Sequence, residues 1–176
     1  MTTRKLTFIL GGARSGKSAF AQQLAESRDT EVLFVATAEA GDEDMAARIA
    51  RHQAERPVHW RTLEAPLAVA QALTTVAPAP VVVLDCVTLW VTNLLLKPNA
   101  DWAMVEAELV QLLAWYHSQS SELIVVSNEV GLGIIPADTV SRTFREWLGW
   151  CNQRLAAQAD TVYLMVAGLP VAIKRS

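Results

Sequence analysis

The feature of this chain that most constrains its fold is a glycine-rich segment near the amino terminus. Residues 11–18 read Gly-Gly-Ala-Arg-Ser-Gly-Lys-Ser and match the phosphate-loop pattern G-x-x-x-x-G-K-[ST] at every position. The apolar run at residues 6–10 predicts a buried strand, and residues 18–27 predict a helix. A glycine turn between a strand and a helix places several backbone N–H groups around an anion. These flanking elements favour a phosphate site over a chance glycine turn.

Each residue of this segment has an expected part in holding phosphate groups. The glycines let the backbone bend and approach phosphate oxygens closely. The lysine is expected to reach the β and γ phosphates of a nucleotide, and the last hydroxyl is expected to bind Mg²⁺. The predicted contacts are Gly11, Gly12, Ala13, Arg14, Ser15, Gly16, Lys17 and Ser18.

Apolar runs alternate with helical patterns along the rest of the chain. Strands are predicted over residues 6–10, 32–36, 81–84, 123–126 and 161–166, with an edge strand over residues 171–173. Helices are predicted over residues 18–27, 42–55, 66–76, 87–96, 101–118 and 141–159. Near-continuous β-branched runs that alternate with helices indicate a mainly parallel sheet with helices on both faces. The expected fold is therefore an α/β P-loop NTPase of the RecA-like kind.

Length, charge and cysteine content limit the classes of protein that fit. A chain of 176 residues with 52% hydrophobic content suits one globular domain over residues 1–176. The net charge of −3 gives no general attraction to nucleic acid, and no apolar run has the length of a membrane span. Cys86 and Cys151 are interpreted as reduced thiols. With no targeting segment recognised, the sequence predicts a cytoplasmic protein.

The strand predicted over residues 81–84 ends at an acidic residue, Asp85. Ligands of parallel sheets bind at the carboxyl ends of the strands, where P-loop enzymes use such an acid to hold the hydration shell of Mg²⁺. Asp85 is therefore predicted to act on the metal together with Ser18. The alternative is that Asp85 caps the helix that follows, near Thr88.

The helix predicted over residues 42–55 carries one of the three histidines of the chain. Asp44, Arg48, His52 and Arg56 are spaced by four, so they form a polar stripe that is exposed or faces a cleft. From spacing alone, a surface histidine is the simpler interpretation of His52. A neutral imidazole beside a bound nucleotide would instead be a nucleophile toward phosphorus, with nearby arginines stabilising the phosphate charge.

Further segments combine with the phosphate loop into a more specific pattern. They are Ala36-Thr37-Ala38, residues 44–49 with His52, Arg56-Pro57, Trp60-Arg61-Thr62 with Glu64, Asp85-Cys86-Val87-Thr88, Thr92-Asn93-Leu94-Leu95, residues 127–136, Arg142, Phe144-Arg145 and residues 152–156. In this order they resemble the bifunctional adenosylcobinamide kinase / adenosylcobinamide-phosphate guanylyltransferase family of cobalamin biosynthesis. The resemblance covers nearly the whole chain. The histidine helix and the Asn-Glu-Val-Gly-x-Gly run make it more specific than the phosphate loop alone.

The resemblance implies two reactions on one corrinoid. ATP or GTP phosphorylates the aminopropanol hydroxyl of adenosylcobinamide. GMP from GTP then passes to that phosphate through a guanylylated histidine, which gives adenosylcobinamide-GDP and pyrophosphate. The family's histidine falls at His52. Together with Lys17 of the phosphate loop, it makes up the predicted catalytic residues. The resemblance also implies a homo-oligomer, specifically a trimer. The nucleotide contacts that it implies beyond the phosphate loop are Ala36, Thr37, Ala38, Gln53, Ala54, Glu55, Arg56, Glu64 and Asp85.

Two other functions stay open from the residues themselves. A single-activity P-loop kinase for a small metabolite would keep Lys17, Ser18 and Asp85 and leave His52 incidental. The second is a nucleotide-switch or regulatory ATPase module. A GTPase switch would ordinarily carry an Asn-Lys-x-Asp element, which the sequence lacks.

Three further polar residues have open roles in the sequence. Glu129 follows a predicted strand, so it is either a metal-binding or basic group or a loop anchor. Arg142 and Arg145 lie along the next predicted helix. They are interpreted as phosphate contacts, as contacts to a neighbouring subunit, or as part of a solvated face.

Overall fold

One sheet contains every strand of the computed structural model, which describes residues 4–54 and 56–175. The strands are β1 (Leu6–Gly11), β2 (Val32–Ala36), β3 (Arg61–Glu64), β4 (Val81–Asp85), β5 (Glu122–Val126), β6 (Thr161–Val166) and β7 (Leu169–Arg175). Their order across the sheet is β3-β2-β4-β5-β1-β6-β7. All neighbours are parallel except β6 and β7. The predicted mainly parallel α/β sheet is therefore confirmed.

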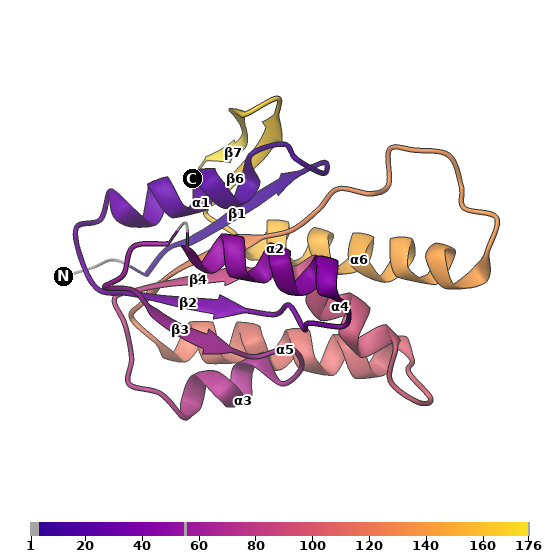
Figure 1. Ribbon diagram of the computed structural model, residues 1–176, viewed down its shortest axis with the longest axis horizontal. Coiled ribbons are helices and arrows are strands. Elements are labelled where there is room, and N and C mark those ends of the chain that lie inside the picture. Colours follow the sequence, from indigo (N-terminus) through magenta and orange to yellow (C-terminus); the bar gives the residue numbers. More distant parts are fainter. Residues whose placement is uncertain (1–3, 55, 176) are drawn as a thin grey trace.

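Helices cover both faces of this sheet, as the alternating pattern predicts (Figure 1). They are α1 (Lys17–Glu26), α2 (Glu43–Ala54), α3 (Val69–Thr74), α4 (Val87–Leu95), α5 (Trp102–Ser118) and α6 (Thr139–Gln158). Leu6 and Phe8 of β1 pack in the core beneath α3 to α6, whereas Ile9 packs in the core beneath α1. The two cores share one strand because side chains alternate across it. None of the described helices is long and apolar enough to cross a membrane.

Short acidic side chains fix where two helices near the site begin. Oδ1 of Asp42 accepts a hydrogen bond of 2.7 Å from the backbone N–H of Met45 at the start of α2. Oδ1 of Asp138 accepts one of 2.8 Å from the N–H of Ser141 in α6. Each bond satisfies an N–H group that has no partner within its own helix. The hydrogen bonds from Ser141 also lower the pKa of Asp138, which favours the ionised cap.

Two strands at the sheet edges differ from the sequence prediction. The prediction contains no strand at β3, whose side chains alternate between half-buried and exposed. An edge strand of this kind lacks the continuous apolar run that marks a buried parallel strand. β7 is longer than the predicted residues 171–173 because it pairs with β6 along an antiparallel hairpin.

One helix is shorter than the sequence prediction. The helical pattern over residues 66–76 corresponds to α3, which begins only at Val69. The carbonyl oxygens of Pro66 and Leu67 instead accept hydrogen bonds from the side chains of Asn93 and Trp90 on α4. Tertiary contacts therefore replace the first turn of the predicted helix.

The parallel strands bring the predicted site residues to one edge of the sheet. Ala36 at the end of β2 is level with Glu64 on β3 and with Asp85 on β4. Asp85 is level with Val126 of β5, and Val126 with Ile9 just before the phosphate loop. The two acids and the phosphate loop thus share the carboxyl edge, where parallel α/β sheets bind their ligands.

Candidate functional site

The phosphate loop joins β1 to α1 and turns where its glycines require it. Gly16 stands at the N-cap of α1 with a φ of 92°, a left-handed conformation that residues with a side chain rarely adopt. A Cβ on Gly11 would lie 2.6 Å from Oγ of Ser15 and 2.7 Å from the carbonyl oxygen of Met165. These glycines keep the loop compact at the amino end of α1. Free N–H groups and the helix dipole favour an anion there.

Lys17 lies buried at the start of α1, with its ammonium group folded over the loop. Its Nζ donates to the carbonyl oxygen of Gly12 at 2.5 Å and to Oγ of Ser15 at 3.4 Å. These contacts hold the positive charge at the place where this motif binds the terminal phosphates of a nucleotide.

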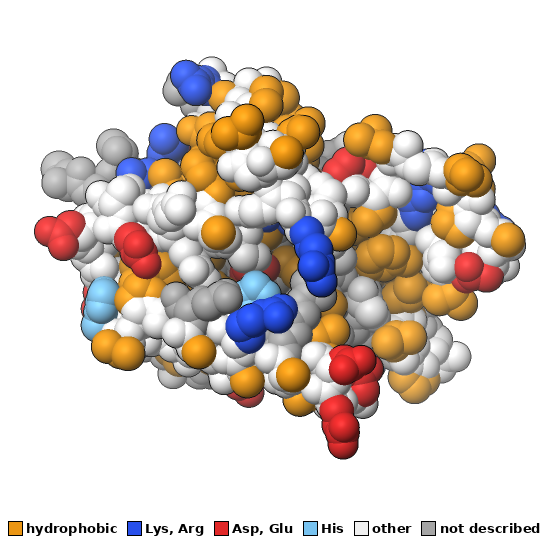
Figure 2. All heavy atoms as spheres, turned by 45° about the horizontal axis from the view of Figure 1, so that its top comes forward, with side chains coloured by type: hydrophobic (Ala, Val, Ile, Leu, Met, Phe, Trp, Pro, Cys, Tyr) orange, Lys and Arg blue, Asp and Glu red, His pale blue; other side chains and the backbone are white. Residues whose placement is uncertain are grey.

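A pocket opens between the amino end of α1, α2 and the carboxyl ends of β2, β3 and β4. It brings together many of the predicted nucleotide, metal and catalytic residues, namely Ser18, Ala36, Ala38, His52, Gln53, Arg56, Glu64 and Asp85. Five lining residues are absent from the sequence prediction: Phe34, Met45, Ile49, Cys86 and Leu89. In Figure 2 basic side chains and a histidine gather near the centre of one face of the molecule. The pocket therefore combines charged groups with a largely apolar wall.

Helix α2 presents His52 to the pocket on the same side as two apolar residues. Met45, Ile49 and His52 recur at intervals of four and three, which places them on one helix face. Residues spaced by four form a row that winds slowly around a helix. The predicted polar stripe therefore begins at Asp44 on a different face and reaches the face of Met45 and Ile49 only at His52. His52 belongs to the cleft-facing end of that stripe and is half-buried in the pocket lining, which favours the cleft-facing alternative over a surface histidine. The sequence signal for this placement was the helical spacing of His52 from the apolar residues Met45 and Ile49.

Arg56 follows α2 and stacks on the pocket wall. Its Cζ lies 3.6 Å from the ring centroid of Phe34. In the described part of the chain its Nε and Nη1 are buried and have no hydrogen-bond partner. Burial lowers the pKa of Arg56, while the charges of Asp85 and Glu64 act in the opposite direction. Buried guanidinium donors without partners are costly, and an anionic ligand in the pocket would satisfy them.

Asp85 ends β4 half-buried in the pocket wall. The alternative role as a helix cap is not supported, since α4 has Cys86 at its N-cap and no side-chain capping bond. Oγ1 of Thr88 instead accepts a hydrogen bond of 2.9 Å from the N–H of Asn128. Burial raises the pKa of the Cys86 thiol to about 12. Cys86 therefore stays protonated at neutral pH and is not a thiolate nucleophile.

Of the predicted phosphate-loop contacts only Ser18 lines the pocket, and among the other described contacts Thr37 and Ala54 do not. Thr37 is fully buried between Ala36 and Ala38, because side chains along an extended segment alternate in direction. Ala54 ends α2 with an exposed side chain outside the pocket lining. Glu55 lies outside the described residues.

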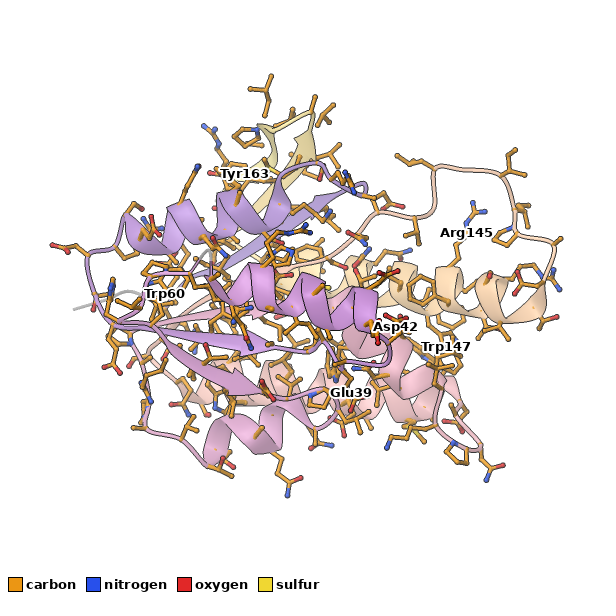
Figure 3. The ribbon with its side chains drawn as sticks, viewed as in Figure 1. Glu39, Asp42, Trp60, Arg145, Trp147 and Tyr163 are labelled. Carbon is orange, nitrogen blue, oxygen red and sulfur yellow. The ribbon has the colours of Figure 1, made fainter. Side chains whose placement is uncertain are left out.

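The loop over residues 127–138 is held by side chains of its own and of α6. Oε1 of Glu129 accepts a hydrogen bond of 2.6 Å from the N–H of Gly131. Nη2 of Arg145 donates to the carbonyl oxygen of Gly131 at 2.6 Å, and Figure 3 shows Arg145 pointing from α6 toward this loop. Arg142 donates to carbonyl oxygens just before α6. These bonds favour the loop-anchor role of Glu129 and give both arginines a structural role within the subunit.

The pocket and the adjoining phosphate loop together hold the groups that two kinds of phosphorus chemistry need. The phosphate loop, the hydroxyl of Ser18 and the carboxylate of Asp85 suit a phosphate chain and its cation. An imidazole at His52 and a guanidinium at Arg56 lie in the same lining. Such a site can stabilise direct phosphoryl transfer and can also supply a nucleophile to phosphorus.

Comparisons with known proteins agree with this chemistry. Residues 7–173 match the model of a family described as cobinamide kinase / cobinamide phosphate guanyltransferase. The bifunctional adenosylcobalamin biosynthesis protein CobP of Pseudomonas aeruginosa is 46% identical over 167 residues, which cover 94% of this chain and 95% of the relative. The corresponding CobU proteins of Escherichia coli and Salmonella typhimurium are each 40% identical over 181 residues, covering 96% of this chain and 99% of each relative.

Proposed function

This chain belongs to the cobinamide kinase / cobinamide phosphate guanyltransferase family, and from that membership we propose how one pocket serves both reactions. The chain is an enzyme of cobalamin biosynthesis that carries kinase and guanylyltransferase activity. In the proposal, a single domain over residues 1–176 performs both steps in the cytoplasm. It first phosphorylates the hydroxyl of adenosylcobinamide with ATP or GTP. It then transfers GMP from GTP to the new phosphate, giving adenosylcobinamide-GDP.

The placement of His52 carries this proposal. His52 lines the same pocket as Ser18, which adjoins the phosphate loop, and as Asp85 at the end of β4. A kinase that used only the phosphate loop would need no imidazole in that wall. Arg56 adds to the same wall a guanidinium whose buried Nε and Nη1 have no hydrogen-bond partner among the described residues. The arrangement supports a histidine that works on a nucleotide bound at its phosphates.

The kinase step depends on the phosphate loop. The hydroxyl oxygen of the acceptor attacks the γ phosphorus, and the bond to the β–γ bridging oxygen breaks as the nucleoside diphosphate leaves. Lys17 and the N–H groups of the loop stabilise the negative charge that spreads over the transferred phosphoryl oxygens. The proton of the acceptor hydroxyl passes to the departing nucleoside diphosphate or to solvent.

The guanylyl transfer splits one displacement into two. A ring nitrogen of His52 attacks the α phosphorus of GTP, an N–P bond forms, and pyrophosphate leaves. A phosphate oxygen of adenosylcobinamide phosphate then attacks the same phosphorus, and the N–P bond breaks to release the imidazole. Arg56 stabilises the charge on the α-phosphate oxygens in both halves.

A Mg²⁺ ion accompanies the nucleotide in this proposal. In the part of the chain that the structure describes, no group of three or more His, Cys, Asp or Glu side chains could hold a metal alone. Mg²⁺ at nucleotide sites needs only one or two protein oxygens, since phosphates and water complete its shell. Ser18 and Asp85 line one pocket and fit that requirement. When bound, the ion would neutralise charge on the phosphate chain.

Glu64 is proposed to recognise the guanine base. Its strand β3 is separated from β1 by β5, β4 and β2, which amounts to about 19 Å at ordinary strand spacing. With the phosphates near Ser18 and the α phosphorus near His52, the base extends toward β3. A carboxylate accepts hydrogen bonds from N1–H and the 2-amino group of guanine together, whereas N1 of adenine presents a lone pair.

We expect Glu64→Gln to change base selectivity from GTP toward XTP. An amide can accept from N1–H of xanthine and donate to its 2-oxo group, but it opposes the 2-amino group of guanine with its own N–H groups. The GTP-to-XTP ratio of kcat/KM for guanylyl transfer should fall about 10- to 100-fold. Glu39→Gln, at an exposed acid outside the pocket, is the matched control and should leave the ratio unchanged. An unaltered ratio in Glu64→Gln would remove Glu64 from base recognition.

A homo-oligomer, specifically a trimer, stays part of the proposal. Two exposed apolar surfaces support it: Leu132, Ile134 and Ile135 on the loop after β5, and Val166 and Leu169 on the hairpin. Apolar side chains also mark the projecting parts of the face in Figure 2. Such surfaces are commonly buried between subunits. Light scattering should give three times the chain mass, and a monomer would contradict this assignment.

Labelling with GTP that carries ³²P at the α position tests the proposed function. The wild-type chain should retain the label through denaturation, release it in mild acid as a phosphoramidate does, and yield a labelled peptide that contains His52. GTP labelled at the γ position should leave no such label. Corrinoid phosphorylation without any α label on the protein would support the single-activity kinase. Nucleotide hydrolysis that needs no corrinoid would support the regulatory ATPase.

A further inference from the structure

The side-chain amide of Asn93 ties together loops that follow two different strands. Asn93 lies on α4, and its Nδ2 donates to the carbonyl oxygen of Thr37 at 2.8 Å and to that of Pro66 at 2.9 Å. Thr37 follows β2, and Pro66 follows β3 by two residues. One amide group therefore uses both of its hydrogens to fix the distance between these loops.

Thr37 extends the same connection to a third strand. Its hydroxyl donates to the carbonyl oxygen of Cys86 at 2.7 Å and accepts from the N–H of Cys86 at 2.9 Å. Cys86 directly follows β4. The side chain of Thr37 is fully buried, so these bonds form away from bulk water, where an unsatisfied partner is costly.

The backbone atoms held by this network adjoin the residues of the pocket wall. Ala36 and Ala38 flank Thr37, Glu64 precedes the β3 loop, and Asp85 precedes Cys86, and all four line the pocket. The N–H of Ala65 also donates to the carbonyl oxygen of Ala36 at 2.8 Å. The relative positions of the two acids therefore depend on hydrogen bonds in which their carboxylates take no part.

The phosphate loop has anchors of its own. The N–H of Gly168 donates to the carbonyl oxygen of Ser15 at 3.0 Å, and the N–H of Glu129 donates to that of Gly11 at 3.1 Å. Neither bond involves α4, β2 or β3. The part of the pocket that holds phosphate and the part formed by β2, β3 and β4 are thus fixed by separate sets of bonds.

We propose that Asn93 is a positioning residue for nucleoside binding, which holds the β2, β3 and β4 ends at the spacing that a GTP molecule requires. Asn93 does not line the pocket and acts through Thr37 and the backbone. The inference rests on the proposed use of this pocket for GTP. The inference adds that a residue of α4 controls the affinity for GTP, independently of the phosphate loop and of His52.

Asn93→Asp is the variant that tests this inference. The carboxylate keeps the shape of the side chain but cannot donate, and it opposes the two carbonyl oxygens that the amide binds. We expect the KM for GTP in guanylyl transfer, and the Kd for GDP measured by calorimetry, to rise at least about tenfold. The kcat at saturating GTP should stay near that of the wild type, because Lys17 and His52 keep their places. Asn93→Ala is the second variant and should shift Kd in the same direction.

Ser121→Ala provides the matched control for stability. Oγ of Ser121 makes a buried hydrogen bond of 2.6 Å to the carbonyl oxygen of Ala79, beside the amino end of β5 and far from the carboxyl edge. Its loss should lower Tm without changing the Kd for GDP. A fall in kcat or Tm in both Asn93 variants with an unchanged Kd would overturn the inference. If the wild type binds GDP but takes no α label, the proposed function fails, while the Kd comparison still decides the role of Asn93.

Discussion

We expect His52→Asn to abolish GMP transfer while most of the kinase activity remains. The amide keeps part of the shape and polarity of the imidazole but is not a nucleophile, so the N–P bond cannot form. Removing a catalytic nucleophile lowers kcat by at least about a thousandfold in enzymes that use covalent intermediates. The kinase step instead depends on the phosphate loop and on Lys17, whose Nζ contacts Gly12 and Ser15 of that loop. Separate assays of corrinoid phosphorylation and of pyrophosphate release from GTP measure the two activities.

His59→Asn is the matched histidine control. His59 is exposed and lies outside the pocket that contains His52. This variant should take the α label from GTP as the wild type does. Full GMP transfer by His52→Asn, or loss of transfer by His59→Asn alone, would show that the nucleophile is misassigned.

Lys17→Ala should weaken both reactions, in contrast to the selective loss at His52. The ammonium group contacts the backbone of the loop at Gly12 and is placed to neutralise the terminal phosphates of either nucleotide. A lost charged contact in the transition state costs roughly 2–4 kcal/mol. We therefore expect kcat/KM to fall about 30- to 1,000-fold for phosphorylation and for guanylyl transfer alike.

Lys97→Ala is the control for Lys17→Ala, since Lys97 is an exposed lysine after α4. It should leave both activities unchanged. Thermal unfolding should accompany the assays, because Lys17 is buried and its removal can also loosen the loop. Loss of the kinase step with intact guanylyl transfer would mean that GTP does not use this loop for the second reaction.

Much of the fold could be predicted because its signals are local. The buried strands β1, β4 and β5 consist mostly of apolar residues, and such runs identify parallel strands without reference to the rest of the chain. β3 gives no such signal, since it lies at the sheet edge and only alternate residues are half-buried. The start of α3 depends on Asn93 and Trp90, which take the carbonyl oxygens of the expected first turn from more than twenty residues away.

The residues of the pocket divide in the same way. The phosphate loop, Asp85 and His52 could be named from motif, strand end and resemblance. Phe34 and Leu89 could not, because nothing in their own segments distinguishes a pocket wall from a core. The network of Thr37 and Asn93 was equally hidden, since the bond between these two residues joins positions 56 apart in the sequence.

The amino-acid order alone determined the glycine turn at which we propose that phosphate binds, because a contiguous loop carries all of that geometry within eight residues. It also determined the strand and helix pattern, because burial on both faces of a parallel sheet leaves a local apolar signature. Only the tertiary structure decided that His52 of α2 lines one pocket with Ser18 of that loop, and which backbone groups hold the acids apart. Those relations depend on the order of strands across the sheet and on hydrogen bonds between distant segments, which no local pattern records.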